Sequence, residues 1–330
     1  MVTTAAARRP YRVGFLLVDG FALLSYASAI EPLRAANQLA GETLYLIDHL
    51  AANDRAATSS SGAVIDATMA MNSRRRFDAV FVVAGGDPIS YRDDRVFRWL
   101  RRLGTKGTQL GGISGGPVIL ALAGLMDGRR MTVHWEHAEA LSEVVPDLLV
   151  ERSLYVRDRD RATCAGGTAP LDMMHALVTE QSGPDFARRV SDWFMHTEVR
   201  PSGGPQRAGL AERYGINNLA LINAIEAMEN HIADPLSLNQ LALLAGLSKR
   251  QLNRLFIEKV NVTTMAFYRR IRLAKAATLL TQSPLSITEI GLATGFASSA
   301  HLSDCFRREY HVTPSSMRKG SSVEAGRIER

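Results

Sequence analysis

The sequence predicts an α/β domain, in which helices flank a mainly parallel sheet, followed by an all-α domain with two helix-turn-helix motifs. Three observations lead to this fold class. Short apolar runs that end near glycines alternate with helical patterns up to residue 196. A segment rich in glycine and proline follows them, and one helical unit then occurs twice.

The α/β domain is predicted over residues 11–196. Its strands are expected at the short apolar runs 11–18, 44–50, 63–67, 78–83, 109–113, 149–156 and 162–165. Its helices are expected at 21–39, 93–103, 117–123, 169–180 and 186–195. Because helices separate most of these strands, neighbouring strands are expected to run parallel.

A linker is predicted over residues 197–216, because the stretch 198–215 holds two prolines and four glycines and has no apolar periodicity. The all-α domain is predicted over 217–320, where the repeated unit lies. Gly246 matches Gly295 at an offset of 49, and Phe256 matches Phe306 at an offset of 50. Apolar spacings of three and four residues on both sides of each glycine indicate two short helices joined by a tight turn. In such a motif the second helix can enter a DNA major groove.

The charge of the chain is concentrated in this repeated region. The whole sequence has a net charge of +6, and residues 217–320 hold 12 Lys and Arg against 7 Asp and Glu, a net charge of +5. A positive surface at this place suits the phosphates of DNA. A helical interaction domain with a basic surface is the alternative interpretation, and the duplication of the motif argues against it.

The composition, 46% hydrophobic and 22% charged, is that of a globular protein. No apolar run approaches the roughly 18 residues of a membrane span, and the N-terminus lacks the apolar core of a signal peptide. Cys164 and Cys305 fall in different predicted domains, which argues against a disulfide framework and against a cysteine metal site. We therefore expect a cytoplasmic protein without a membrane segment, a metal or a cofactor.

The second helix of each motif supplies the candidate DNA contacts. In the first motif Ser248 is expected to cap the helix, and the outward side chains are Lys249, Arg250, Gln251 and Arg254. Arg can bind guanine with two hydrogen bonds, and Gln can bind adenine in the same way. In the second motif the candidates are Ser298 or Ser299 as the cap, His301, Asp304, Arg307 and Arg308. The last two arginines suit phosphate contacts.

Residues 219–319 resemble the AraC/XylS-type DNA-binding domain, on the motifs GF-x-S, HL-x-x-x-F-R-R and the closing V-T-P. The resemblance implies that both recognition helices lie on one face of double-stranded promoter DNA, in successive major grooves. One departure is Met317, where that family usually has an aromatic residue, so a local packing change is expected.

A different motif stands at the end of a predicted strand, where residues 112–116 read G-x-S-x-G with Ser114 at the centre. This is the pattern of a serine-hydrolase nucleophile elbow. Such a serine needs a base and an orienting acid, for which Asp172 and either His175 or His196 are candidates. Asp172 and His175 fall one turn apart on a predicted helix, whereas triad partners usually lie on loops. A serine hydrolase or amidase with a DNA-binding appendage is therefore the alternative function.

Residues 11–196 also resemble the PfpI-type, glutamine-amidotransferase-like superfamily. The shared stretches are AGG at 84–86, the elbow at 111–117, GLMDGRRMTVHW at 124–135 and AGGTAPLDMMHALV at 165–178. Enzymes of that superfamily carry a cysteine at the elbow and an acidic residue after the first strand. This chain has Ser114 and Ser25 there, although His134 remains. Since a serine hydroxyl is far less acidic than a thiol, the pocket is expected to have lost its reaction.

The fusion of the two domains resembles the GlxA-type transcriptional regulators. Within them, SYASAIEPLRAANQLAGETLY, VHWE and GGTAPLDMM are most similar to regulators of glycine betaine, carnitine or arginine catabolism. The resemblance implies a homodimer that senses a small nitrogen-containing metabolite, cationic or zwitterionic, in its α/β domain. It also implies activation of catabolic genes and contact with RNA polymerase.

A pocket for such a metabolite needs an aromatic face or a carboxylate for the cation and N–H groups for a carboxylate. Candidates for the cation are Trp135, with His134 and Glu136 beside it, and Glu31. Candidates for the anion are the backbone N–H groups of Gly85, Gly86 and Gly115, with Ser114 and Ser25 beside them. Trp135 as core, His134 as a structural histidine and the glycines as backbone devices are the open alternatives. A protein that binds DNA without any ligand is a third interpretation.

Overall fold

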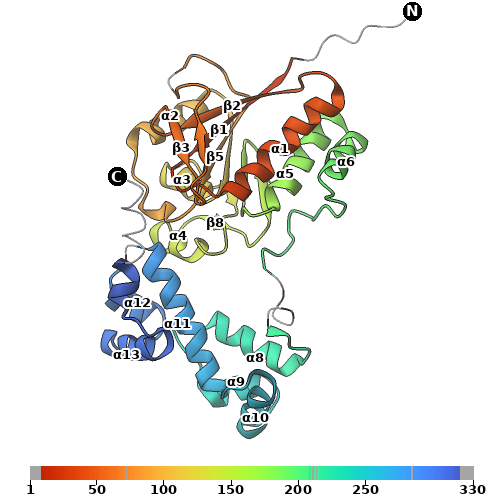
Figure 1. Ribbon diagram of the computed structural model, residues 1–330. Helices are drawn as coiled ribbons and strands as arrows, with labels where there is room; N and C mark the ends of the chain where they lie inside the picture. The colour runs from red at the N-terminus through yellow and green to blue at the C-terminus, as the bar shows by residue number, and fades with distance from the viewer. Residues whose placement is uncertain are drawn as a thin grey trace, which may run out of the picture. The chain divides into compact units, whose positions relative to one another are not determined.

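A computed structural model describes residues 9–319, apart from 72, 208, 210, 211, 213 and 284. The chain forms two compact units that divide between Gln206 and Arg207. The first unit is α/β and the second is helical, as Figure 1 shows in red to green and in cyan to blue. No helix among the described residues has the length and apolar character that crossing a membrane requires.

The α/β unit is built on a six-stranded sheet with the order β2-β1-β5-β6-β10-β9. Its strands are β1 (Tyr11–Leu17), β2 (Tyr45–Ala51), β5 (Ala79–Ala84), β6 (Gln109–Ser114), β9 (Tyr155–Asp158) and β10 (Arg161–Cys164). All neighbouring pairs are parallel except β9 and β10. The mainly parallel sheet predicted from the sequence is thus confirmed.

Two predicted strands differ from those observed. The apolar run at 63–67 forms β4 (Val64–Asp66), which pairs with β3 (Ala56–Thr58) outside the main sheet. The run at 149–156 divides into β8 (Leu149–Val150), paired with β7 (Arg130–Met131), and the start of β9. The apolar pattern of a short strand does not show which sheet it joins, and the apolar residues Val64 and Leu149 are exposed in these small sheets.

Helices cover both faces of the main sheet (Figure 1). One face packs against α1 (Leu23–Ala40), α5 (Ala169–Ser182) and α6 (Pro184–Trp193), and the other against α2 (Asp94–Thr105), α3 (Gly116–Leu122) and α4 (Ala138–Val144). Successive side chains of one strand enter opposite cores: Phe81 and Val83 of β5 lie in the first, and Val80 and Val82 in the second. Burial on both faces explains why β5 reads as an unbroken apolar run.

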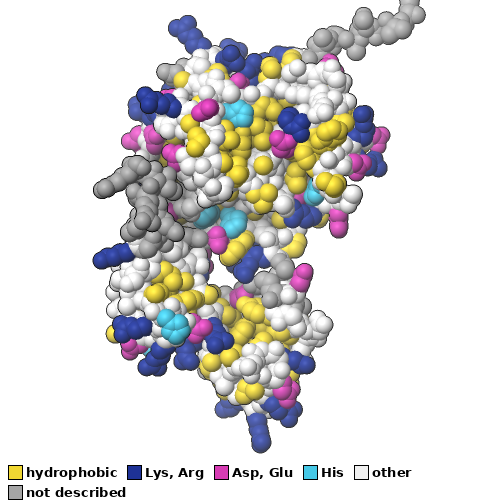
Figure 2. Space-filling model, in the orientation of Figure 1, with side chains coloured by type: hydrophobic (Ala, Val, Ile, Leu, Met, Phe, Trp, Pro, Cys, Tyr) yellow, Lys and Arg dark blue, Asp and Glu magenta, His cyan; other side chains and the backbone are white. Residues whose placement is uncertain are grey.

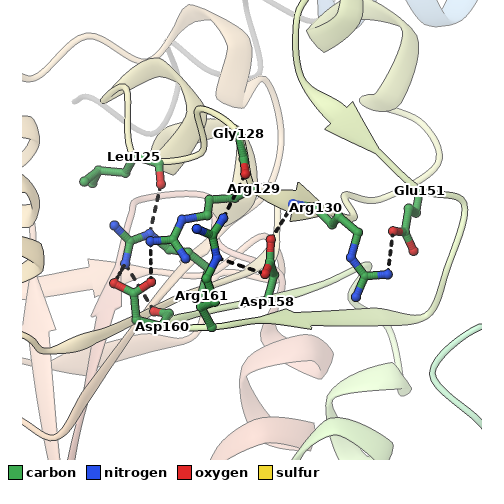
Figure 3. A network of polar contacts seen from close by, with 9 residues as sticks. Leu125, Gly128, Arg129, Arg130, Glu151, Asp158, Asp160 and Arg161 are labelled. Atoms are coloured by element: carbon green, nitrogen blue, oxygen red, sulfur yellow. Dashed lines mark hydrogen bonds and ion pairs between the residues drawn. The ribbon is translucent and has the colours of Figure 1, made fainter.

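A network of polar contacts at the edge of this unit fixes the loop that precedes β7 (Figure 3). Arg161 of β10 donates from Nε to the carbonyl oxygen of Leu125 at 2.9 Å and from Nη1 to Asp160 at 2.7 Å. The backbone N–H of Arg130 donates to Asp158 at 2.9 Å. These bonds tie the α3–β7 connection to the β9–β10 hairpin, so that the chain leaving β7 starts from a fixed place.

The helical unit contains α8 (Leu219–Asn230), α9 (Leu238–Leu244), α10 (Lys249–Val260), α11 (Thr264–Gln282), α12 (Ile287–Ala293) and α13 (Ser299–Tyr310). Each helix-turn-helix motif has its own core, one around Leu252 and Phe256 and the other around Leu302 and Phe306. The long helix α11 contributes to both cores and so connects them.

Contacts of α11 with each motif, and one contact between the motifs, hold them in one body. The Tyr268 hydroxyl of α11 donates to the carbonyl oxygen of His231, which follows α8. One turn later, Arg272 donates from Nε to the carbonyl oxygen of Thr294 at 2.7 Å. A Cβ added at Gly295 would lie 2.5 Å from Cγ of Pro235, so the turn of the second motif packs directly on the α8–α9 loop.

The two matching turn glycines are therefore expected to differ in their tolerance of alanine. Both have left-handed backbones, with φ of 68° at Gly246 and 69° at Gly295, but a Cβ at Gly246 meets nothing within 4 Å. Gly246→Ala should lower the free energy of unfolding by about 1–2 kcal/mol through backbone strain alone. Gly295→Ala should cost a further ~1–3 kcal/mol because of the clash with Pro235. Hydrogen exchange of the α12 amides in increasing urea measures the loss of stability in each variant. Equal losses in the two variants would contradict the close packing of Gly295 on Pro235.

Candidate functional site

The sharp turn predicted at the end of β6 is present. Ser114 is the last residue of β6 and has a left-handed backbone with φ of 60°. Helix α3 begins two residues later, where Gly116 lies so close to β5 that an added Cβ would be 1.9 Å from the carbonyl oxygen of Val82. Only glycine fits at this crossing, which explains the glycine that closes the G-x-S-x-G pattern.

The partners proposed for a serine hydrolase do not assemble at Ser114. Among the described residues, none forms a side-chain hydrogen bond with the Ser114 hydroxyl. Asp172, which is fully buried, does meet His196, whose Nε2 lies 2.8 Å from Oδ1. His175 instead pairs through Nδ1 with the hydroxyl of Ser191 at 2.8 Å. Within the described chain the elbow thus lacks a base in hydrogen-bond contact with its serine.

Ser25 and Ser114 together support a glycine loop. The hydroxyl of Ser25 accepts a hydrogen bond from the N–H of Gly167 at 2.8 Å. A Cβ added at Gly166 would lie 2.8 Å from Cβ of Ser114 and 3.0 Å from the hydroxyl oxygen of Ser25. Ser25 and Ser114 therefore pack beneath the 166–167 loop.

A cavity of about 200 Å³ lies beside this loop. Its walls come from the segment after β7, from the loop that leads into α5, and from residues that precede the helical unit. The lining residues are His134, Trp135, Leu154, Ala165, Gly166, Gly167, Thr168, Ala169, Arg200 and Gln206. Sequence analysis identified His134 and Trp135, and it missed Thr168, Arg200 and Gln206 because nothing in their local pattern relates them to the elbow.

The three glycines whose backbone N–H groups are predicted to bind an anion lie outside the lining of the cavity. The N–H of Gly115 donates to the carbonyl oxygen of Ala84 at 3.0 Å, so it is already used. Gly85 packs on the β1–α1 loop, where an added Cβ would lie 2.6 Å from the carbonyl oxygen of Gly20. Gly86 is exposed. None of these glycines lines the cavity.

The acidic candidates for the cation also lie outside the lining of the cavity. Glu31 forms an ion pair at 2.7 Å with Arg34 on the surface of α1. Glu136 lies 3.5 Å from Nδ1 of His134, so it contacts a lining residue without lining the cavity itself. Burial lowers the pKa of His134, which favours a neutral imidazole there.

The first half of the predicted linker is part of the α/β unit. Arg200 donates to Asp172 from its backbone N–H at 2.8 Å, from Nε at 3.0 Å and from Nη2 at 2.6 Å. The carbonyl oxygen of Ser202 accepts from the N–H of Leu154 at 2.9 Å. Nε2 of Gln206 lies 2.7 Å from the carbonyl oxygen of Ser153. Residues 200–206 therefore form a wall of the cavity.

The recognition helices α10 and α13 have matching exposure at every position after the first. In both, the leucine and phenylalanine of the repeat are buried, and of the three residues between them only the middle one, Arg254 or Asp304, is exposed. Lys249, Arg250 and Arg254 are exposed on α10, and His301, Asp304, Arg307 and Arg308 on α13. Lys and Arg side chains project from the part of the helical unit that carries α10 and from the area of α13 (Figure 2).

Two of the candidate DNA contacts have structural roles in the helix caps. Gln251 forms a capping box with Ser248, and its Oε1 accepts from the backbone N–H of Ser248 at 2.9 Å. Its amide is thus engaged and does not stand free to read adenine. In the second motif Ser298 is the cap and accepts from the N–H of His301 at 3.2 Å, while Ser299 is the first helical residue.

A buried histidine beside the cavity predicts acid sensitivity. His137 is 4% exposed, and burial, with a smaller contribution from His134, lowers its pKa to about 4. Below pH 6.5 the unfolded chain takes up a proton that the folded chain does not, so stability falls with pH. The free energy of unfolding should drop by about 1.6 kcal/mol from this group between pH 6.5 and 5. Urea denaturation at both pH values should show a smaller loss of unfolding free energy for His137→Asn than for the wild-type chain. Equal losses in the two chains would contradict the assignment of this acid sensitivity to His137.

Comparison with known proteins agrees with both halves of this description. The DJ-1/PfpI family matches residues 11–180, and a helix-turn-helix domain family matches residues 241–320. The HTH-type transcriptional regulator GlxA of Rhizobium meliloti is 49% identical over 97% of this chain and 99% of its own length. The HTH-type transcriptional regulator CdhR of Pseudomonas aeruginosa is 40% identical over 91% of this chain and 89% of its own length.

A solved structure of an AraC family transcriptional regulator from Pseudomonas putida is similar to this chain with a TM-score of 0.51. It is 26% identical and covers 56% of this chain and 100% of its own. The family matches include the elbow at Ser114 and both recognition helices. The chain therefore belongs to the family of HTH-type transcriptional regulators that join a DJ-1/PfpI domain to an AraC-type helix-turn-helix domain.

Proposed function

We propose that this regulator binds promoter DNA through α10 and α13 in response to a small nitrogen-containing metabolite held in the cavity of the α/β unit. The observation that carries the proposal is the presence, in one chain, of two recognition helices with matching exposure and a cavity beside a former catalytic elbow. The exposed basic side chains supply attraction to phosphates, and the cavity supplies a place for an effector.

The two recognition helices contribute unequally to the affinity for DNA. Lys249, Arg250 and Arg254 give α10 three exposed cations near its N-terminal half. Arg254 is 75% exposed and lies 3.5 Å from Glu258, a weak surface pair that a guanine can replace. On α13 the outward positions are His301 and Asp304, followed by a basic pair at 307–308 that suits phosphates. Affinity is therefore assigned mainly to α10.

The cavity suits a small metabolite with a cationic group. Its volume of about 200 Å³ is below that of pockets for drug-sized ligands. Trp135 lines it and is 40% exposed, and an indole ring is an aromatic surface of the kind that attracts a quaternary ammonium or guanidinium ion. A neutral His134 beside it does not repel such a cation. A quaternary amine or a basic amino acid is the ligand class that fits.

We assign the α/β unit a sensing role and no catalysis, because Ser114 has no base in hydrogen-bond contact among the described residues. The family role completes the proposal: a cytoplasmic homodimer, associated through the α/β unit, that activates catabolic genes by contact with RNA polymerase. Binding of the metabolite would alter how the two units act on DNA through the segment that joins them.

Arg254→Ala tests the DNA assignment. Loss of a base contact from an exposed arginine should weaken specific binding by about 1–3 kcal/mol, or roughly 5- to 150-fold. Fluorescence anisotropy with a promoter fragment measures the affinity. Arg188→Ala is the matched control, because Arg188 is an exposed arginine of the α/β unit that pairs with Asp185 on the surface of α6. Equal affinities for Arg254→Ala and the wild-type chain would refute the assignment.

The catalytic alternative makes an opposite prediction at Ser114. A serine without a base is not activated, so a fluorophosphonate probe should leave the intact mass of the chain unchanged. A known serine hydrolase in the same tube shows that the probe is active. A mass increase that disappears in Ser114→Ala would establish a reactive nucleophile and overturn the sensing role.

A further inference from the structure

Arg200 presents a guanidinium group to the cavity from a fixed position. Its Nε and Nη2 atoms donate to Asp172, and Nη2 also donates to the hydroxyl of Thr168 at 2.9 Å. Asp172 is fully buried, whereas the Arg200 side chain remains 38% exposed. The remaining amino group, Nη1, forms no hydrogen bond with any described residue. Arg200 thus combines an oriented charge with a free donor at the wall of the cavity.

Such an arrangement suits a second carboxylate. A guanidinium group has five donors in a rigid plane, and one edge can bind Asp172 while Nη1 binds another anion. The hydrogen bonds from Nε and Nη2 to Asp172 fix the plane of the guanidinium group before a ligand binds. Little side-chain freedom of Arg200 is therefore lost on binding. Trp135 on the same cavity offers an aromatic face for a cation. The cavity therefore contains complementary positions for both ends of a small zwitterion.

The same arginine anchors the chain that leads to the helical unit. Arg200 holds the start of residues 200–206 to Asp172, and Gln206 holds their end. Nε2 of Gln206 donates toward Thr132, Val133 and Ser153, but its buried Oε1 has no partner among the described residues. The unpaired Oε1 offsets part of the stabilisation that the Nε2 hydrogen bonds give, so Gln206 holds the segment weakly. An additional bond at Arg200 would therefore strengthen the attachment of the segment appreciably.

We propose that Arg200 binds the carboxylate of a zwitterionic effector through Nη1, and that this bond fixes residues 200–206 to the α/β unit. The proposal rests on the sensing function proposed above and specifies its ligand chemistry, a carboxylate together with a cationic nitrogen. It also identifies the first step of the response, which is a change in the anchoring of the segment that precedes Arg207.

Two ligand pairs test the carboxylate. L-Arginine and agmatine share a guanidinium group, and glycine betaine and choline share a quaternary ammonium group; only the first of each pair has a carboxylate. For the full-length chain, calorimetric titration should show at least tenfold tighter binding of the carboxylate member of the pair that binds. Equal affinity within that pair would overturn the proposal.

Arg200→Lys keeps the positive charge that Asp172 requires and removes the planar fork. The preference for the carboxylate member should fall to nearly one in this variant. Trp135→Leu should weaken both members of the pair by a similar factor and so keep the preference. Arg188→Lys, on the surface of α6, is the control and should change nothing. A preference that survives Arg200→Lys refutes the role of Arg200.

Limited trypsin digestion tests the anchoring. Arg207 is the first tryptic site after the segment, since Arg200 precedes a proline. The carboxylate probe should slow cleavage there at least fivefold in the wild-type chain and should have no effect in Arg200→Lys. Unchanged or faster cleavage in the wild-type chain would overturn the coupling.

The experiments distinguish a failure of the role of Arg200 from a failure of the sensing function. If the wild-type chain binds a probe but Arg200→Lys retains the preference, this inference is wrong and the sensing function stands. If no member of either pair binds the wild-type chain, the ligand class of the proposed function is wrong, and this inference falls with it.

Discussion

A fully buried carboxylate, Asp172, determines how the α/β unit ends. It accepts hydrogen bonds from the backbone and the guanidinium group of Arg200 and pairs with His196. A buried charge left without partners costs about 3–5 kcal/mol. Pairing with Asp172 therefore stabilises the chain after α6 in a path that returns to α5. That return places residues 200–206 against the loop before α5 and completes the cavity. The position of the segment that precedes the helical unit thus depends on one acid in the first turn of α5.

Much of the fold could be predicted from local patterns. The parallel strands are apolar because both faces are buried, and the repeated motifs show themselves by matching spacings around two glycines. The elbow at Ser114 is equally local, since a sharp turn at a crossing with β5 needs glycine at 116. These features depend on residues close together in the sequence, where periodicity and turn chemistry are informative.

The walls of the cavity could not be predicted in this way. Arg200 and Gln206 lie in a stretch whose composition indicates a linker, and their partners lie 28 or more residues away. The N–H of Gly115 is bonded to the carbonyl oxygen of Ala84, and no local pattern in the sequence indicates that bond. Gln251 was placed on the outward face correctly, yet the S-x-x-Q spacing with Ser248 was a local signal for a capping box that favoured a structural role.

In the proposed function, an effector bound in the α/β unit changes how the paired recognition helices act on DNA. The contacts of Tyr268, Arg272 and Gly295 keep the two motifs in a single body, so a change in the preceding segment acts on both together. Thermodynamic linkage tests this claim most directly: the affinity for DNA selected in vitro is measured with and without L-arginine or glycine betaine, and the ligand affinity with and without that DNA. The account predicts that both affinities change by the same factor, at least fivefold. Ligand and DNA affinities that are independent of each other would contradict it.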